Sequence, residues 1–189
     1  MNRLARALAT PLLVLAPMTA LADCPEAPDI TAAIDGLLGE VQAARTEAEA
    51  RALSDRFWEQ WATAPDSRAQ ELLDEGMTRR ASFDFAGAIV AFDALVDYCP
   101  DYAEGYNQRA FANFLRADFE AAVPDLERAI ALSPRHVAAI SGLGLTLISM
   151  GRTEEGHDRI REALALNPWL QERFYLPDPP DPTKRAIEL

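Results

Sequence analysis

Apolar positions recur at helical spacing soon after the start of the chain. Over residues 26–66 the first run of apolar side chains repeats every three or four residues, which is the spacing of one helix face. A second run follows at i, i+4 and i+8. The first stripe comprises Ile30, Ile34, Leu37, Leu38 and Val41, and the second comprises Leu53, Phe57 and Trp61. The pattern therefore predicts a helical hairpin, which Pro65 ends.

A longer period organises the middle of the chain. Pro100, Pro134 and Pro168 are spaced by 34 residues, and the segments 69–102, 103–136 and 137–170 align without a gap. A fixed period of this length is typical of arrays of helical hairpins. Each proline stops the second helix of its unit and turns the chain into the next one.

Small and large side chains alternate at matching places in the three segments. The eighth position is always small, and so is the twentieth, whereas the fourth and twenty-fourth are large and apolar. These sets are Gly76, Ala110 and Gly144; Ala88, Ala122 and Gly156; Leu72, Tyr106 and Ile140; and Phe92, Leu126 and Ile160. Small residues at positions eight and twenty allow two antiparallel helices to cross closely, and the large ones fill the space beside the crossing.

These residues resemble the tetratricopeptide repeat family, whose signature each segment meets in part. Departures are Glu75 and Arg109 at an apolar position and Pro124 inside a second helix, where a kink is expected. The resemblance implies an all-α, right-handed superhelical stack of three helix-turn-helix repeats over 69–170. Residues 23–66 are then an N-terminal helical hairpin, interpreted as a cap on the stack, with a degenerate fourth repeat as the alternative.

Several short motifs predict where helices begin. Thr46-Glu-Ala-Glu49 and Ser67-Arg-Ala-Gln70 match the capping box, and Asp101-Tyr-Ala-Glu104 resembles it with Asp in the capping role. Asp84 and Asp118 are placed to cap the second helices of the first two repeats. The proline-rich segment 171–189 is expected to be extended or mobile, or to fold back into the groove of the array.

The chain begins with the pattern of a secretory signal. Arg3 and Arg6 precede a short apolar run, and Ala20-Leu21-Ala22 forms a small-residue cleavage site, so residues 1–22 are expected to be removed. The apolar run is shorter than the roughly 20 residues that span a bilayer, so no membrane span is expected in the mature chain. Lipidation of Cys24 is disfavoured because Asp23, which is not small, precedes it. The expected location is the periplasm.

An oxidising compartment changes what the two cysteines are expected to do. A disulfide between Cys24 and Cys99 is the obvious pairing, and two unrelated thiols are the alternative.

With 18 basic and 30 acidic residues the net charge is −12, which argues against nucleic acid as a partner. The two histidines, His136 and His157, have no neighbouring ligand residues, so no metal, cofactor or catalytic residue is expected.

The family resemblance implies a concave groove lined by the first helix of each repeat. The expected partner-binding residues are Met77, Arg80, Asn107, Phe111, Phe114, Leu145 and Ile148. The polar residues with which some family members grip a peptide carboxylate are absent, since their places hold Leu73, Met77, Gln108, Ala138 and Gly142. The expected function is therefore a non-enzymatic scaffold that binds a peptide or helix of another protein through an apolar groove. A self-assembly module, with the groove filled by its own segments or a second copy, is the alternative.

Overall fold

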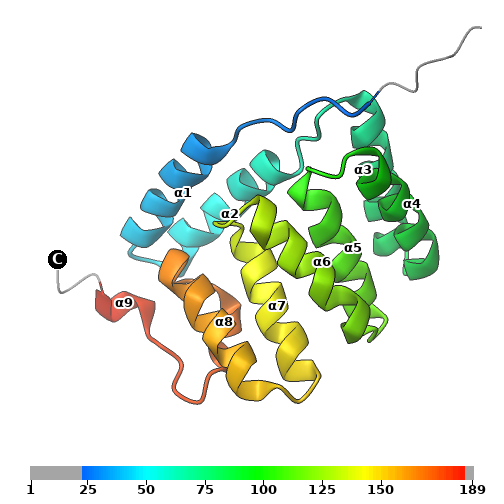
Figure 1. The fold of residues 1–189 in the computed structure, drawn as a ribbon. Coiled ribbons are helices and arrows are strands. Elements are labelled where there is room, and N and C mark those ends of the chain that lie inside the picture. Colours follow the sequence, from blue (N-terminus) through cyan, green and yellow to red (C-terminus); the bar gives the residue numbers. More distant parts are fainter. Residues whose placement is uncertain (1–22, 186–189) are drawn as a thin grey trace, which may run out of the picture.

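The computed structural model describes residues 23–185, and this part of the chain is helical throughout, with no strand. The predicted signal segment 1–22 lies outside the described residues. Six helices make three consecutive antiparallel pairs, as the 34-residue period predicts (Figure 1). They are α3 (Ser67–Ala81), α4 (Phe85–Tyr98), α5 (Ala103–Leu115), α6 (Phe119–Leu132), α7 (Val137–Ser149) and α8 (Thr153–Leu166). The prediction of an all-α repeat stack is confirmed.

Close helix crossings occur at the predicted small residues. A Cβ atom on Gly76 would lie 2.6 Å from Cζ of Phe92, whose side chain is fully buried. A Cβ atom on Gly156 would lie 2.6 Å from the carbonyl oxygen of Gly144 in the partner helix. Both distances are shorter than atoms tolerate, so glycine is what allows these pairs to pack as they do.

Arg109, which departs from the apolar repeat pattern, joins three helices instead. From α5 its guanidinium donates to Asp125 of α6 at 2.6 Å and to Asp93 of α4 at 2.8 Å. Hydrogen bonding to Asp125 raises the pKa of Arg109 above its usual value.

Pro124 lies in α6, which continues from Phe119 to Leu132. The proline ring is exposed, so the backbone hydrogen bond that proline cannot donate is missing on the solvent side of the helix.

The capping predictions are partly right. Thr46 accepts from the backbone N–H of Glu49 at 3.2 Å, and Asp84 accepts from that of Gly87 at 3.0 Å. The Ser67 prediction is wrong, because the preceding Asp66 caps α3 by accepting from Ala69 at 2.8 Å. Asp118 stands at the predicted cap of α6, but its side chain makes no capping bond.

The capping box predicted at Asp101 is also wrong. Helix α5 begins after Tyr102, and no side chain caps it. Glu104, which the motif assigned to the cap, is buried among polar side chains. The Glu104 carboxylate accepts hydrogen bonds from these buried side chains and not from the backbone at the start of α5.

The three turns inside the repeats share one backbone conformation. Phe83, Ala117 and Gly151 occupy the same place in successive repeats and have φ angles of 63°, 61° and 80°. Only the third repeat uses glycine, the residue that adopts this conformation without strain. Phe83 is also 81% exposed, so neither its backbone conformation nor burial of its side chain explains a phenylalanine there.

The N-terminal hairpin consists of α1 (Thr31–Ala43) and α2 (Glu47–Trp61), as predicted. Its apolar side chains, however, pack against the last repeat, with Leu38 and Val41 in one core cluster with Ile140 and Trp169. The interpretation as a cap on the N-terminal end of the stack is therefore wrong. The hairpin crosses from the first repeat to the last, as the blue and cyan helices show in Figure 1.

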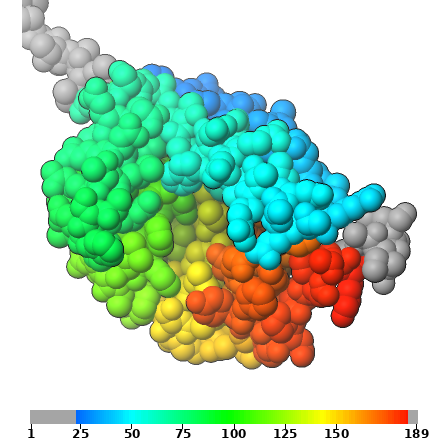
Figure 2. Space-filling view, turned by 180° about the vertical axis from the view of Figure 1, so that it is seen from behind, coloured from blue at the N-terminus to red at the C-terminus, as the bar shows by residue number. Residues whose placement is uncertain are grey.

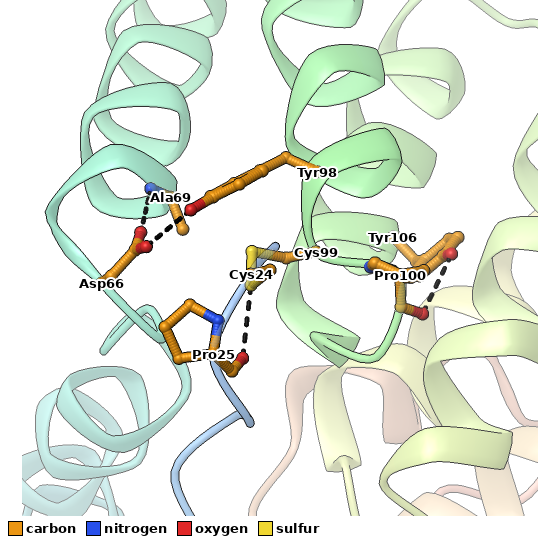
Figure 3. Close-up of a disulfide and its surroundings, with 8 residues drawn as sticks. All are labelled: Cys24, Pro25, Asp66, Ala69, Tyr98, Cys99, Pro100 and Tyr106. Carbon is orange, nitrogen blue, oxygen red and sulfur yellow. Dashed lines mark hydrogen bonds between the residues drawn. A yellow bond between two sulfur atoms is a disulfide. The ribbon is translucent and has the colours of Figure 1, made fainter. Parts of the chain in front are cut away.

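The segment before α1 is held to the first repeat. We call residues 23–30 the strap; it runs across the top of the view in Figure 1. The structure pairs Cys24 of the strap with Cys99 at the end of α4, with 5.1 Å between their Cα atoms (Figure 3). Next to this pair, the Tyr98 hydroxyl donates to Asp66, which also caps α3. The first repeat thus anchors both ends of the hairpin.

The C-terminal segment is more ordered than its prolines suggest. Residues 171–175 form a 3₁₀ turn, η1 (Gln171–Tyr175), and a short helix α9 covers Pro182–Arg185. Leu176 is buried against Ile160 and Leu164 of α8. The expectation of an extended or mobile segment is wrong for these residues, because Leu176 and the buried Arg173 give the segment contacts that hold it on the last repeat.

Candidate binding groove

The first helices of the repeats, α3, α5 and α7, lie side by side and form one wall of a hollow of about 290 Å³. Figure 2 shows this face, with yellow atoms of α7 set back between the green α3–α5 side and the cyan α2. We call the hollow the groove. It is lined by Trp58, Arg80, Asn107, Gln108, Ala110, Phe111, Phe114, Leu126, Ala138, Ser141, Gly142, Leu145, Thr146 and Glu172.

Five of the seven predicted partner-binding residues line the groove: Arg80, Asn107, Phe111, Phe114 and Leu145. Met77 and Ile148 do not, so their prediction as groove residues is wrong. Met77 packs against the core of the first repeat, and Ile148 packs against the core of the last helix pair. The same repeat position therefore lines the groove in one repeat and not in another, as Phe111 and Met77 show.

Two groove residues come from outside the repeats. Trp58 lies on α2, and Glu172 lies on η1, where its carboxylate is 3.5 Å from the Ser141 hydroxyl. Repeat register could not assign either residue, because register applies only within the array. The remaining unpredicted groove residues belong to the repeats, and Ala138 and Ser141 lie at the second and fifth positions of the third repeat. The groove is thus bordered, but not filled, by segments of the chain itself.

Arg80 is the cationic side chain of the groove. Its guanidinium lies 4.6 Å from the centre of the Phe111 ring, an arrangement that stabilises a cation over an aromatic face. It also donates to the side-chain oxygen of Gln108. Burial lowers the pKa of Arg80 from its usual value, although a guanidinium stays charged at neutral pH.

A buried polar network is joined to Arg80 through Gln108. Glu104 is 1% exposed and accepts from Asn107 at 3.1 Å and from the amide of Gln108. The Nε2 atom of His136 lies 2.8 Å from the second carboxylate oxygen of Glu104. Because Nδ1 of His136 accepts from the backbone N–H of Ala139, Nε2 carries the proton that Glu104 accepts. Each carboxylate oxygen therefore has a donor within the protein.

His136 also connects this network to the hairpin. Its ring stacks on Trp61 of α2 with 4.2 Å between ring centres and 11° between planes. The Tyr102 hydroxyl donates to the backbone oxygen of Trp61 at 2.7 Å. Burial raises the pKa of Tyr102, which keeps this hydroxyl protonated. These contacts give His136 a structural role within the described structure.

A second hollow of about 590 Å³ lies beneath the strap. The strap and α1, the end of α2 and the links α4–α5 and α6–α7 border it. It is larger than the groove and more acidic, since Glu26, Asp29, Asp35, Asp101 and Glu104 line it against a single arginine, Arg135. That arginine is already paired with Asp35.

The described residues 23–185 hold no group of three or more His, Cys, Asp and Glu side chains that could bind a metal ion. Within the same range no helix combines the length and the apolar character that crossing a membrane requires. What the groove does offer is an apolar surface with a few polar groups, which is the usual make-up of a binding site.

Comparisons with known proteins agree with the fold. The chain is 42% identical over 72 residues to a tetratricopeptide repeat protein 36 homolog of Nematostella vectensis, covering 38% of this chain and 40% of that protein. It is 32% identical over 137 residues to tetratricopeptide repeat protein 36 of Xenopus tropicalis, covering 69% and 64%. The chain thus spans 40 to 64% of the length of these relatives. No protein-family model matches it.

Solved structures show the same arrangement of helices. The tetratricopeptide repeat domain of Arabidopsis OM64 superposes with a TM-score of 0.55 at 20% identity, covering 64% of this chain and 94% of that one. The first such domain of Spaghetti (RPAP3), bound to the HSP90 peptide SRMEEVD, gives 0.55 at 23% identity, covering 65% and 91%. These likenesses establish the helical repeat fold of tetratricopeptide domains for this chain.

Proposed function

We propose that the chain is a non-enzymatic scaffold of the bacterial cell envelope that binds peptide segments of other proteins in the groove. The observation that carries this proposal is the grouping of Phe111, Phe114, Leu145 and Trp58 around one hollow. Phe111 remains 44% exposed there. Aromatic side chains left partly exposed in a concave site are typical of surfaces that bind apolar groups of a partner.

The structural neighbours support the same kind of ligand. The Spaghetti domain is described in complex with an HSP90 peptide, and a domain of human RPAP3 is described in complex with an HSP70 peptide. Both share the fold of this chain. The polar residues of the carboxylate-gripping members are replaced here, so we propose a ligand with an apolar anchor.

The envelope location rests on the sequence. The pattern of residues 1–22 supports export, and an oxidising compartment suits the Cys24–Cys99 pair. Fractionation of a Gram-negative host, followed by sequencing of the mature N-terminus, tests it. We expect a periplasmic protein that begins at Asp23; a cytoplasmic protein that retains residues 1–22 would contradict this part of the proposal.

Peptide binding is tested with Phe111→Asp. Seven-residue peptides selected from a displayed library on the unaltered protein are measured by fluorescence anisotropy. We expect this substitution to weaken binding at least tenfold, because a carboxylate replaces the apolar surface that anchors the ligand. The matched control is Phe83→Asp, which changes an 81% exposed phenylalanine outside the groove and leaves affinity unchanged. Equal affinity in both variants would refute groove binding.

Self-assembly is a second candidate function, and one observation favours it. Phe83 and Val90 of the first repeat are 81% and 69% exposed, an unusual position for large apolar side chains at a strained turn and a helix surface. Light scattering over a range of concentrations distinguishes the two functions. A monomer at every concentration removes self-assembly, whereas a dimer that Phe83→Asp dissociates supports it.

A further inference from the structure

The two ends of the groove carry opposite charges. Arg80 stands on α3 and contacts Phe111 and Gln108 of α5, whereas Glu172 stands on η1 and contacts Ser141 of α7. Because α5 lies between α3 and α7, the cation and the carboxylate border the hollow from its two sides. The groove therefore has a direction as well as an apolar surface.

Neither Arg80 nor Glu172 forms an ion pair with another described residue. Within the described part of the chain, no oppositely charged side chain lies within 4.0 Å of Arg80 or of Glu172. Arg109, by comparison, has Asp93 and Asp125 as partners. Glu104 attracts Arg80 electrostatically but makes no ion pair with it, because Gln108 lies between them and accepts from Arg80 while donating to Glu104. A half-buried cation without a carboxylate in direct contact is costly, and a ligand that supplies one reduces that cost.

The surface between the two charges is apolar and short. Phe111 and Phe114 of α5 and Leu145 of α7 lie between Arg80 and Glu172 in the order of the helices, and Trp58 of α2 lines the hollow from the hairpin. A hollow of about 290 Å³ lies at the lower end of the range for small-ligand sites, so it suits a few side chains and not a long extended segment.

We infer that the groove binds a short peptide segment in which one large apolar side chain is flanked by a carboxylate on one side and a basic group on the other. The carboxylate pairs with Arg80, the apolar side chain rests on Phe111 and Phe114, and the basic group pairs with Glu172. This inference rests on the proposed peptide-binding function and adds to it the charge order of the ligand.

The test uses three capped peptides with the same central phenylalanine: acetyl-Asp-Phe-Lys-amide, acetyl-Lys-Phe-Asp-amide and acetyl-Asn-Phe-Gln-amide. Two-dimensional NMR titrations of the full chain measure affinities into the millimolar range. We expect one of the two charged orders to bind about tenfold more tightly than the neutral peptide, which is the effect of two partly exposed ion pairs. The reversed order binds no better than the neutral peptide, because it places like charges together.

Single neutral substitutions assign the two charges. Arg80→Gln and Glu172→Gln should each remove part of the preference for the favoured charged peptide and leave the neutral peptide within about twofold. The matched controls are Arg68→Gln, which alters an exposed arginine over Tyr98, and Glu127→Gln, which alters an exposed glutamate of α6. Thermal melting of each variant verifies that it folds, and the double variant Arg80→Glu, Glu172→Arg should prefer the reversed peptide.

The outcomes separate this inference from the proposed function. If all three peptides bind equally and Phe111→Asp abolishes their binding, the groove binds apolar side chains and the charge order is wrong. If none of the three shifts the resonances of groove residues, the inference is overturned as well, while the library selection above still decides whether the groove binds peptides at all.

Discussion

The three repeats and the N-terminal hairpin are built from the same unit, a pair of antiparallel helices, but different contacts hold them in place. The two helices of each repeat pack on one another through crossings at residues such as Gly76 and Gly156, and each repeat packs on its sequence neighbours. The hairpin packs on residues a hundred or more positions away, including contacts of Asp35 with Arg135 and of Gln42 with Ala165. Repeats therefore form from local register, whereas the hairpin depends on the completed stack.

The difference matters for the groove. The repeats supply its wall, with Phe111, Phe114 and Leu145, and the hairpin and η1 supply Trp58 and Glu172 at its border. A change that loosens the hairpin should widen the groove without disturbing its wall, and a change in a repeat crossing should disturb both.

The largest expected effect comes from the Cys24–Cys99 link, which would join residues 75 positions apart and fasten the strap to the first repeat. Replacing both cysteines by serine should lower the free energy of unfolding by up to about 4 kcal/mol, since the unfolded chain regains the freedom of that loop. Urea denaturation measures the loss. Reductant should lower the stability of the unaltered protein and leave the double-serine variant unchanged.

Hydrogen exchange sharpens this prediction. If the link chiefly holds the hairpin, amide protection should fall more in α1 and α2 than in α7. Equal urea midpoints for the two proteins, together with two titratable thiols in the unaltered one, would show that the cysteines are not joined.

A smaller effect is expected at a repeat crossing. Gly76→Ala should destabilise the protein by about 1–3 kcal/mol, because the added methyl group meets the buried Phe92 ring. Gly36→Ala in α1 is the matched control. Nothing lies within 4 Å of its Cβ position, so it should stabilise the protein by about 0.5–1 kcal/mol. Thermal or urea unfolding measures both, and equal effects would contradict the close crossing.

The smallest effect concerns a helix cap in the hairpin. Thr46→Ala should cost about 1 kcal/mol, because it removes the acceptor for the Glu49 N–H at the start of α2. Ser67→Ala should change stability little, since Asp66 and not Ser67 caps α3. Urea unfolding midpoints of the two variants measure the difference. A larger loss of stability for Ser67→Ala than for Thr46→Ala would support the capping box that the sequence predicts at Ser67.

These elements show how far sequence reasoning reached. The 34-residue period and the small residues at positions eight and twenty predicted the helix pairs, because helix crossing distance depends on side-chain size at a fixed place in each repeat. Motif matching alone failed at Ser67 and Asp101, where a neighbouring aspartate and a buried polar network offered better hydrogen-bond partners. For the groove, register found Arg80, Asn107, Phe111, Phe114 and Leu145 but misplaced Met77 and Ile148.

By itself the sequence determined the helices, their pairing and the apolar character of the concave wall, since all three follow from periodicity and residue size over short distances along the chain. Only the tertiary structure decided that the hairpin crosses to the last repeat and that Trp58 and Glu172 border the groove. It also decided that Arg80 and Glu172 border the groove without an ion-pair partner among the described residues. Such relations join segments far apart in the chain, and no local pattern encodes which distant surfaces meet.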